Sequence, residues 1–261
     1  MTRLPRQQSS SGFYHIVFRG VNHCHLFEEQ EDYEKMLVLL ATAKEDLPLL
    51  IHAYCLLSNH VHLLVQAPSS EDIAQAMRMV LGPYANWFNR KYLRSGALIA
   101  NRYRSECVED DRYLLALVRY IHQNPVAAGA SRRIGDYRWS SYREYSTGTR
   151  LLTDTGFILA IFSEDPSRTV EEFKAFHSII EPFEDALTDK AIRVDGEIYL
   201  EVRSILKGAE PHTVTSLPRA ERDDILACLR ERGFSIRQIE RVTGISRGIV
   251  ARAKQLPDTK T

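Results

Sequence analysis

The sequence predicts an α+β fold in which helices cover one face of an antiparallel sheet, followed by an all-α region at the C-terminus. Over residues 13–123, apolar stretches of strand length and amphipathic helical stretches occur in the order β-α-β-β-α-β-α. A short polar turn joins two of the strands into a hairpin. A chain of 261 residues can bury a substantial core.

The first half of this pattern contains three strands and one helix. A strand is expected at 13–20, where the alternation in F-Y-H-I-V-F-R is typical of a strand. Helical periodicity follows over 31–46 and ends before Pro48. Apolar strands at 49–57 and 60–66 are separated only by Ser-Asn, which predicts a hairpin.

The second half adds two helices and one strand. Ser69 or Ser70 can cap a helix that runs to about Lys91. A short strand is expected at 103–108. The next helix is strongly amphipathic, begins with acidic residues at 110 and is expected to stop at Asn124-Pro125.

The rest of the chain has a different character. Around 146–155 the composition turns to Ser, Thr, Gly and Asp, which indicates a linker. We therefore expect an α+β domain over 1–147, a helical connecting region over 148–215 and a helix-turn-helix-like module over 216–261.

Composition excludes several classes of protein. Hydrophobic residues at 44% and charged residues at 26% are ordinary for a soluble globular protein. No run of about 20 apolar residues predicts a membrane span, and residues 1–12 do not resemble a signal peptide. The four cysteines form no CxxC pair, which favours reduced thiols in a cytoplasmic protein.

The net charge of zero conceals a basic segment. Between Arg78 and Arg143 there are 12 Lys and Arg against 5 acidic residues, a local balance of +7, with ten Tyr, Trp and Phe interleaved. Arginines mixed with aromatic side chains suit a groove for single-stranded nucleic acid. The alternative is a solvated helix face beside core aromatic residues.

His60-Val61-His62 lies inside the second strand of the hairpin. Side chains at positions i and i+2 of a strand point to the same face, so both imidazoles can converge on one metal ion. The alternative is a pair of surface or hydrogen-bonded histidines without a metal.

Tyr120 and Asn124 are spaced i, i+4 near the end of the amphipathic helix and so share a face. The phenol oxygen could attack a phosphorus atom while the Asn124 amide oxygen completes a metal shell. Because free tyrosine has a pKa near 10, such a nucleophile needs a divalent ion to activate the phosphate, and these ligands suit Mg²⁺ or Mn²⁺. Alternatively, Tyr120 is a core aromatic beside Leu117 and Ile121.

Five motifs occur in order along the chain. They are S-N-H-V-H-L-L-V from Ser58, N-R-K-Y from Asn89, R-Y-R-S from Arg102, Y-I-H-Q-N-P-V-A-A-G from Tyr120 and D-Y-R-W-S-S-Y from Asp136. Together they closely resemble the motifs of the single-tyrosine HUH transposases of the IS200 type, in the branch associated with repetitive extragenic palindromes (REP). The resemblance covers about residues 12–147.

The resemblance implies a ferredoxin-like catalytic core that cleaves and rejoins single-stranded hairpin DNA. It makes His60 and His62 ligands of Mg²⁺ or Mn²⁺, and Asn124 the third ligand. Tyr120 is then the nucleophile, which forms a 5′-phosphotyrosine link and leaves a free 3′-OH. The stretch at 96–101, G-A-L-I-A-N, departs from the more aromatic, Gln-containing stretch of relatives.

Two sets of basic residues are candidates for contact with DNA. In the α+β domain these are Arg102, Arg104 and Arg119, each of which could instead be a solvated surface charge. At 234–256 the pattern predicts a helix-turn-helix whose second helix, capped by Ser246, presents basic side chains to a major groove. These are Arg247, Arg252 and Lys254. A small helical bundle that docks on the core is the alternative.

Three functions remain open: a DNA strand transferase, a DNA-binding transcriptional regulator without catalysis, and a rolling-circle initiator or relaxase. The complete set of His60, His62, Tyr120 and Asn124 favours an enzyme, and the single tyrosine favours the transposase. We expect a monomer or homodimer that is cytoplasmic, associated with the nucleoid and not bound to a membrane.

Overall fold

The computed structural model contains two compact units, 1–187 and 188–261, which we describe separately. In the first unit the structure describes residues 7–100, 102–163 and 165–179. In the second it describes residues 199, 202–206, 208–209, 211–232, 234 and 236–253.

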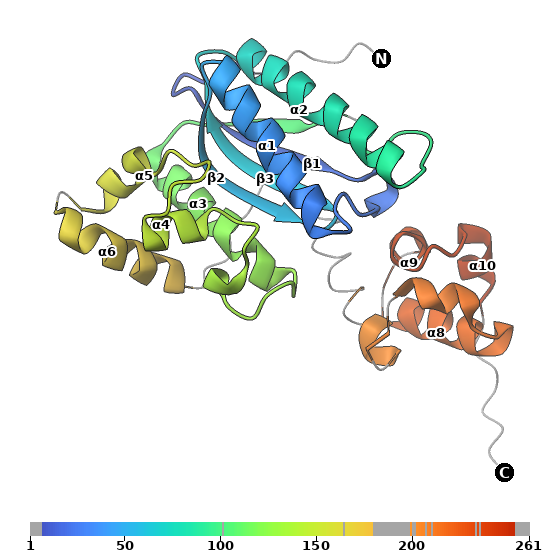
Figure 1. Ribbon diagram of the computed structural model, residues 1–261. Helices are drawn as coiled ribbons and strands as arrows, with labels where there is room; N and C mark the ends of the chain where they lie inside the picture. Colours follow the sequence, from blue (N-terminus) through green and yellow to red (C-terminus); the bar gives the residue numbers. More distant parts are fainter. Residues whose placement is uncertain are drawn as a thin grey trace. The chain divides into compact units, whose positions relative to one another are not determined.

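The first unit contains one sheet and six α-helices within its described residues (Figure 1). Up to the end of the sheet the elements are β1 (Phe13–Arg19), α1 (Gln30–Asp46), β2 (Leu50–Leu57), β3 (His60–Gln66), α2 (Ser70–Lys91) and β4 (Arg104–Val108). They are followed by α3 (Asp111–Ala127), α4 (Tyr142–Thr147), α5 (Thr155–Phe162) and α6 (Pro166–Ser178). Short 3-10 turns occur at Val21–His23 and Ile134–Asp136.

The sheet has the strand order β2-β3-β1-β4, and every neighbouring pair is antiparallel. The connections through α1 and α2 each skip one strand, which produces two interleaved β-α-β units, the ferredoxin-like arrangement. The α+β fold class and the order of its elements are therefore confirmed. Ser69, and not Ser70, caps α2, because its hydroxyl accepts a hydrogen bond from the backbone N–H of Asp72.

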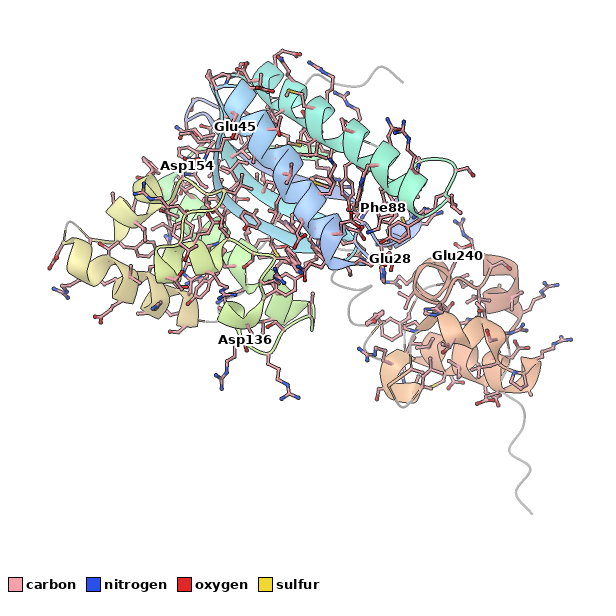
Figure 2. All side chains as sticks on the ribbon, in the orientation of Figure 1. Glu28, Glu45, Phe88, Asp136, Asp154 and Glu240 are labelled. Carbon is pink, nitrogen blue, oxygen red and sulfur yellow. The ribbon has the colours of Figure 1, made fainter. Side chains whose placement is uncertain are left out.

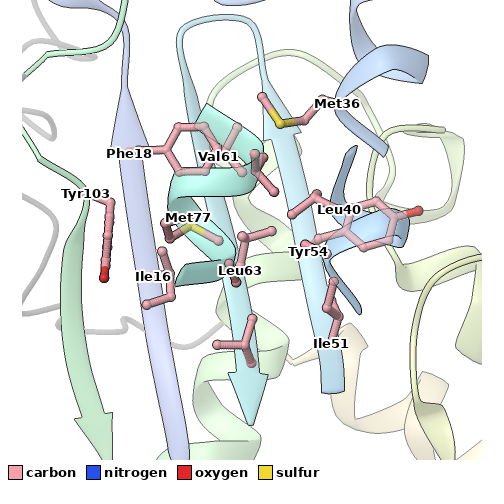
Figure 3. Close-up of a cluster of buried hydrophobic side chains, with 14 of the residues drawn as sticks. Ile16, Phe18, Met36, Leu40, Ile51, Tyr54, Val61, Leu63, Met77 and Tyr103 are labelled. Atoms are coloured by element: carbon pink, nitrogen blue, oxygen red, sulfur yellow. The ribbon is translucent and has the colours of Figure 1, made fainter. Parts of the chain in front are cut away.

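One face of the sheet packs against α1 and α2, which lie side by side across it (Figure 1). The core between these layers is apolar along the whole length of the strands (Figure 3). Its fully buried side chains come from all three long strands and both helices, and include Ile16, Ile51, Leu63, Leu40 and Val80. This burial is the main contribution to the stability of the layer.

The expectation that helices cover only one face is wrong in one respect. Helix α3 packs on the opposite face, where Leu117 and Ile121 join a second core cluster with Cys55 and Leu64. The reason lies in β2 and β3, whose side chains are almost all buried on both faces. A strand that is apolar on both sides needs a helix on each.

The expected end of the α3 helix at Asn124-Pro125 is also wrong, since the helix continues to Ala127. Pro125 lies in the last turn, so the ring removes one helical hydrogen bond near an end where the ladder stops anyway. The ladder closes beyond the proline, where the N–H of Ala128 donates to the carbonyl of Asn124 at 2.8 Å. Asn124 therefore keeps helical geometry and the same face as Tyr120.

The region expected to connect two domains instead extends the first unit. Ile158 of α5 and Phe173 of α6 are buried in the second core cluster. The Phe173 ring stacks on Tyr145 of α4 at a centroid distance of 4.7 Å. Helices α5 and α6 thus belong to the α+β unit, because the apolar surface of α3 and α4 requires a cover.

The loop before α5 is tied to the sheet by two carboxylates. Buried Glu144 accepts hydrogen bonds from the backbone N–H groups of three consecutive residues, Leu151, Leu152 and Thr153. Asp154, labelled in Figure 2, accepts from the N–H of Ile51 at 3.0 Å and forms an ion pair with Lys44 at 2.8 Å. The expected linker at 146–155 is therefore an ordered part of the fold.

The second unit is helical in its described residues. It contains a 3-10 turn (Pro211–Ser216), α8 (Arg219–Glu231), α9 (Ile236–Thr243) and α10 (Arg247–Arg252). Leu226, Ile239 and Val250, one from each helix, share an apolar core. Gly244 lies in the turn with φ of +75°, a conformation that glycine adopts without strain.

Within the described parts of the chain, no helix is both long enough and apolar enough to cross a membrane. The cysteines Cys24, Cys55, Cys107 and Cys228 are all free thiols.

Candidate active site

The strand register places the histidine pair on the face of the sheet that packs against α3. His60 lies opposite Arg19 of β1, and His62 lies opposite Val17. Val17 in turn lies opposite Arg104 of β4. Because directly opposed residues point to the same side, this face carries two histidines and two arginines at one end.

The two imidazoles lie beside each other, as the i, i+2 spacing predicts. Their ring centroids are 5.1 Å apart and their planes are inclined by 77°. His62 is buried, whereas His60 is half-buried. The pair therefore combines one imidazole that the protein encloses, His62, with one that is partly accessible to solvent, His60.

Each histidine is held through its Nδ1 atom. His60 Nδ1 lies 2.7 Å from the side-chain oxygen of Asn59, which can only accept, so this nitrogen carries the proton. His62 Nδ1 lies 3.0 Å from Nε2 of His15. Such partners fix the orientation and tautomer of an imidazole.

His15 is a member of the site that sequence reasoning missed. It is fully buried on β1, and its ring stacks against His62 at a centroid distance of 5.3 Å. The available signal was a histidine within an otherwise apolar strand. Only the pairing of β1 with β3 shows that this histidine shares the face of His62.

Helix α3 brings Tyr120 to the histidines within one chain. The Tyr120 ring stands edge-on to His62, with centroids 5.5 Å apart and planes inclined by 86°. It stands in the same way toward His15 at 6.5 Å. The structure therefore unites residues that are 58 positions apart in the sequence, between His62 and Tyr120.

Asn124 lies one turn beyond Tyr120 on the same helix and is buried. Its amide nitrogen donates to the backbone carbonyl of Tyr120 at 3.4 Å. Among the described residues no group of three or more His, Cys, Asp or Glu side chains is placed to hold a metal ion. The role of Asn124 as a third ligand stays a prediction.

A buried hydrogen-bond chain fixes α3 against the sheet close to Tyr120. His122 bonds through Nε2 to the hydroxyl of Ser141 at 2.7 Å and through Nδ1 to His177 of α6 at 3.0 Å. Ser141, from the W-S-S-Y motif, accepts from the backbone N–H of Tyr54 in β2 at 2.9 Å. Both ring nitrogens of His122 are thus engaged by protein groups.

Burial keeps this chain of side chains neutral. Burial, together with the nearby His177, lowers the pKa of His122 well below its usual range. Burial also lowers the pKa of His177 to about 4, although a hydrogen bond to the carbonyl of Phe173 opposes the shift.

The three arginines predicted to contact DNA lie in different environments. Arg102 and Arg104 are exposed, and Arg104 lies on the face of the histidines. Arg119 is only 7% exposed, and its guanidinium lies 4.4 Å from the ring centroid of Phe176 in α6. The expectation for Arg119 is therefore not supported, because α6 covers it.

The basic residues predicted in the second unit lie on α10. Arg247 is exposed and bonds to Glu240 of α9, and Arg252 is exposed and donates to the carbonyl of Gly248 at 2.8 Å. Ser246 occupies the N-cap position without a side-chain cap hydrogen bond. Lys254 lies outside the described residues.

Comparison with known proteins gives matches to a family, to a single protein and to a solved structure. Residues 8–124 match a family described as Transposase IS200 like. A REP-associated tyrosine transposase of Haemophilus influenzae is 31% identical over an alignment of 102 positions, with a coverage of 34% of this chain. The chain spans 57% of the length of that relative. Among solved structures, a REP-associated tyrosine transposase bound to a REP hairpin matches at 18% identity with a TM-score of 0.49.

The structural match covers 58% of this chain and 89% of the other. The segment matched by the family contains both histidines and Tyr120, and ends at Asn124. Over residues 8–124 the chain is therefore similar to the IS200-like transposases, the family that its motifs resemble.

Proposed function

We propose that this protein is a transposase that cleaves and rejoins single-stranded, hairpin-bearing DNA through a covalent link to Tyr120. The observation that carries the proposal is the edge-on placement of the Tyr120 ring 5.5 Å from His62 within one chain. A nucleophile beside a potential metal site is the arrangement that phosphoryl transfer requires.

The donor set fits a divalent ion. His60 and His62 are each engaged at Nδ1 by a protein group, as is usual for imidazoles that bind a metal through Nε2. Asn124 would add an amide oxygen, and the mixed set suits Mg²⁺ or Mn²⁺. When bound, such an ion would draw charge from a non-bridging oxygen of the scissile phosphate.

The covalent step follows from the position of the phenol. The Tyr120 oxygen forms a bond to the phosphorus in line with the departing 3′-oxygen, and the P–O3′ bond breaks. The phenol loses its proton and the 3′-oxygen gains one, so the products are a 5′-phosphotyrosine and a free 3′-OH. Because the phosphodiester energy is conserved in the protein–DNA bond, another 3′-OH can reverse the step without ATP.

The helix α3 contributes by holding the nucleophile still. His122 and Ser141 connect this helix to β2 by hydrogen bonds, and Leu117 and Ile121 pack on the sheet. A catalytic group that is fixed before substrate binds loses little entropy in reaching the transition state.

The proposed DNA contacts divide between the two units. Arg102 and Arg104 are exposed near the histidine face and would contact the phosphate backbone. Arg247 and Arg252 on α10 would bind a duplex region, such as the stem of a hairpin, by the geometry of a helix-turn-helix. The similar solved structure contains a REP hairpin, which supports this choice of partner.

A second candidate function is a DNA-binding regulator without catalysis. The observation in its favour is the α9–turn–α10 arrangement with exposed arginines on α10. The same experiment separates the two functions.

The test uses labelled single-stranded hairpin oligonucleotides from the DNA that flanks the gene, with Mg²⁺, Mn²⁺ or EDTA. We expect a covalent adduct on a denaturing gel for the wild type, lost with EDTA and in Tyr120→Phe. Tyr113→Phe is a matched control, because Tyr113 lies two turns earlier on α3 and bonds to Glu106. Binding without an adduct in either metal would favour the regulator.

A further inference from the structure

Arg19 occupies the position opposite His60 at the basic end of the histidine face. It is the last residue of β1, and its register partner on β3 is His60. Side chains of directly opposed residues begin only about 5 Å apart and lie on the same side of the sheet. Arg104 lies in the adjacent row, separated from His62 by Val17.

On β1 and β4 this end of the face carries no member of the second core cluster, whereas on β2 Leu57, which lies opposite His60, belongs to it. The members of that cluster from β1 and β4 are Phe13 and Val108, which are paired with each other at the far end of the sheet. At the near end Arg19 and His60 are half-buried and Arg104 is exposed. A substrate phosphate can therefore approach the histidines from the side where the arginines lie.

The backbone around Arg19 is fixed on both sides. Its carbonyl accepts a hydrogen bond from Ala100 at 2.8 Å, and the N–H of the following Gly20 donates to Asn59 at 2.9 Å. A Cβ on Gly20 would lie 2.0 Å from the carbonyl oxygen of Cys24, so only glycine fits there. Gly20 thus anchors the end of β1 to the turn between β2 and β3. This turn also carries Asn59, whose side chain bonds to His60 Nδ1.

We propose that Arg19 binds the scissile phosphate and stabilises the charge that develops on it in the transition state. This inference rests on the proposed function. A guanidinium presents donors in a planar fork that matches two phosphate oxygens, and it stays charged at any physiological pH. The anchored backbone holds the Cα of Arg19 opposite His60 before DNA binds, so the guanidinium needs only side-chain rotation to meet a phosphate at the histidines.

The other arginines fit this role less well. Arg119 is covered by Phe176, and Arg104 is one strand further from the histidines than Arg19. Arg104 is therefore expected to guide the strand, whereas Arg19 contacts the phosphate that reacts.

The experiment compares Arg19→Ala, Arg19→Gln and Arg19→Lys with the wild type on a hairpin oligonucleotide. At saturating DNA, the single-turnover rate of adduct formation should fall by about 100-fold or more in Arg19→Ala. Arg19→Lys should recover part of the rate, and Arg19→Gln should not. Arg78→Ala is the control, because Arg78 lies on α2 and bonds to Glu71.

Binding to the same oligonucleotide is measured in a Tyr120→Phe background, so that cleavage does not interfere. Each Arg19 variant should weaken binding far less than it slows cleavage. When the logarithm of the binding constant is plotted against the logarithm of the salt concentration, removing one phosphate contact should also make the slope shallower by about 0.7. Circular dichroism checks that each variant is folded, and Arg19→Gln substitutes if Arg19→Ala is not.

Two results would overturn the inference: cleavage by Arg19→Ala within about threefold of the wild type, or equal losses in binding and rate. The first is incompatible with an electrostatic contribution of the size above. If the wild type itself forms no adduct, the proposed function fails. An unchanged salt slope would then reject the phosphate contact of Arg19 separately.

Discussion

The two faces of the sheet differ in how the character of their side chains changes from one end of the strands to the other. On the face of α1 and α2, alternate residues of β1 are Tyr14, Ile16 and Phe18, all buried in one apolar core. The intervening residues Phe13, His15, Val17 and Arg19 face α3 and change from apolar to charged along the same strand. In β3 the order Leu64, His62, His60 shows the same change toward the same end.

This difference indicates how a small unit combines stability with chemistry. The α1/α2 face contributes apolar burial along its whole length, whereas on β1 and β3 the α3 face changes from apolar side chains to histidines and Arg19 toward one end. The side chains of the candidate site that lie on β1 and β3 belong to strands whose backbone is already fixed by the apolar core on the other face. Functional groups on strands are held more accurately than groups on loops, and Tyr120 and Asn124 approach from a different layer, helix α3.

The largest effects should come from substitutions that leave a cavity in the core on either face of the sheet. A comparison of the two faces should show which substitution lowers only the stability and which also lowers the activity. Leu40→Ala in α1 and Leu117→Ala in α3 both remove a fully buried side chain. Each should lower the free energy of unfolding by about 2–5 kcal/mol in urea titrations. Only Leu117→Ala should slow cleavage by the folded protein, by up to about 100-fold, because it loosens the helix of Tyr120.

Single-turnover assays well below the unfolding midpoint measure this second quantity. Equal rates for the two variants would mean that the packing of α3 does not position the nucleophile.

Local patterns predicted most of the fold, since alternation and helical periodicity act over a few residues. The exception concerns α3, where Pro125 indicated a stop and the apolar second face of β2 required a cover. Helices α5 and α6 were predicted as helical but not as part of this unit. Their docking depends on long-range contacts, such as Tyr145 with Phe173, that no local pattern contains.

The candidate site likewise contains residues whose position a local pattern predicted and residues whose position it did not. His60 and His62 could be predicted to share a face, because two residues on one strand suffice for the argument. His15 and Arg19 could not, because their place depends on which strand lies beside β3 and in which register. The expectation for Arg119 failed for a related reason, since its cover, Phe176, lies 57 residues later.

An intermediate effect should distinguish His15 from His52, which are both buried in the sheet. His15→Phe removes the partner of His62 Nδ1 and should weaken Mn²⁺ binding by about 10–100-fold. His52→Phe is the matched control, because His52 is equally buried on β2 but bonds to Asp154 and Gln66. Isothermal titration calorimetry with the metal alone measures both.

The contrary outcome is an equal loss in the two variants, which would assign the effect to general disturbance of the sheet. No loss in either would mean that His15 does not orient His62.

The smallest effect concerns helix α6, which packs on α3 and α4 and so forms a second helical layer on the α3 face. Burial lowers the pKa of His177 to about 4 and lowers that of His122, whereas both should titrate near 6.5 in the unfolded chain. Between these values the unfolded chain binds protons that the native chain does not. The free energy of unfolding should therefore be complete above about pH 6.5 and fall as the pH decreases toward 4.

His177→Gln removes one of these groups but keeps a side chain that can hydrogen-bond to His122. In this window the variant should have a shallower dependence of unfolding free energy on pH, by at most about 1.4 kcal/mol per pH unit. Urea titrations followed by the fluorescence of Trp87 and Trp139 report on this unit, since both tryptophans lie in it. His25→Gln, at an exposed position, is the control. If both variants gave the wild-type slope, α6 would have to separate from α3 before the histidines are protonated, and the layer that covers Arg119 would be the first part of the unit to open.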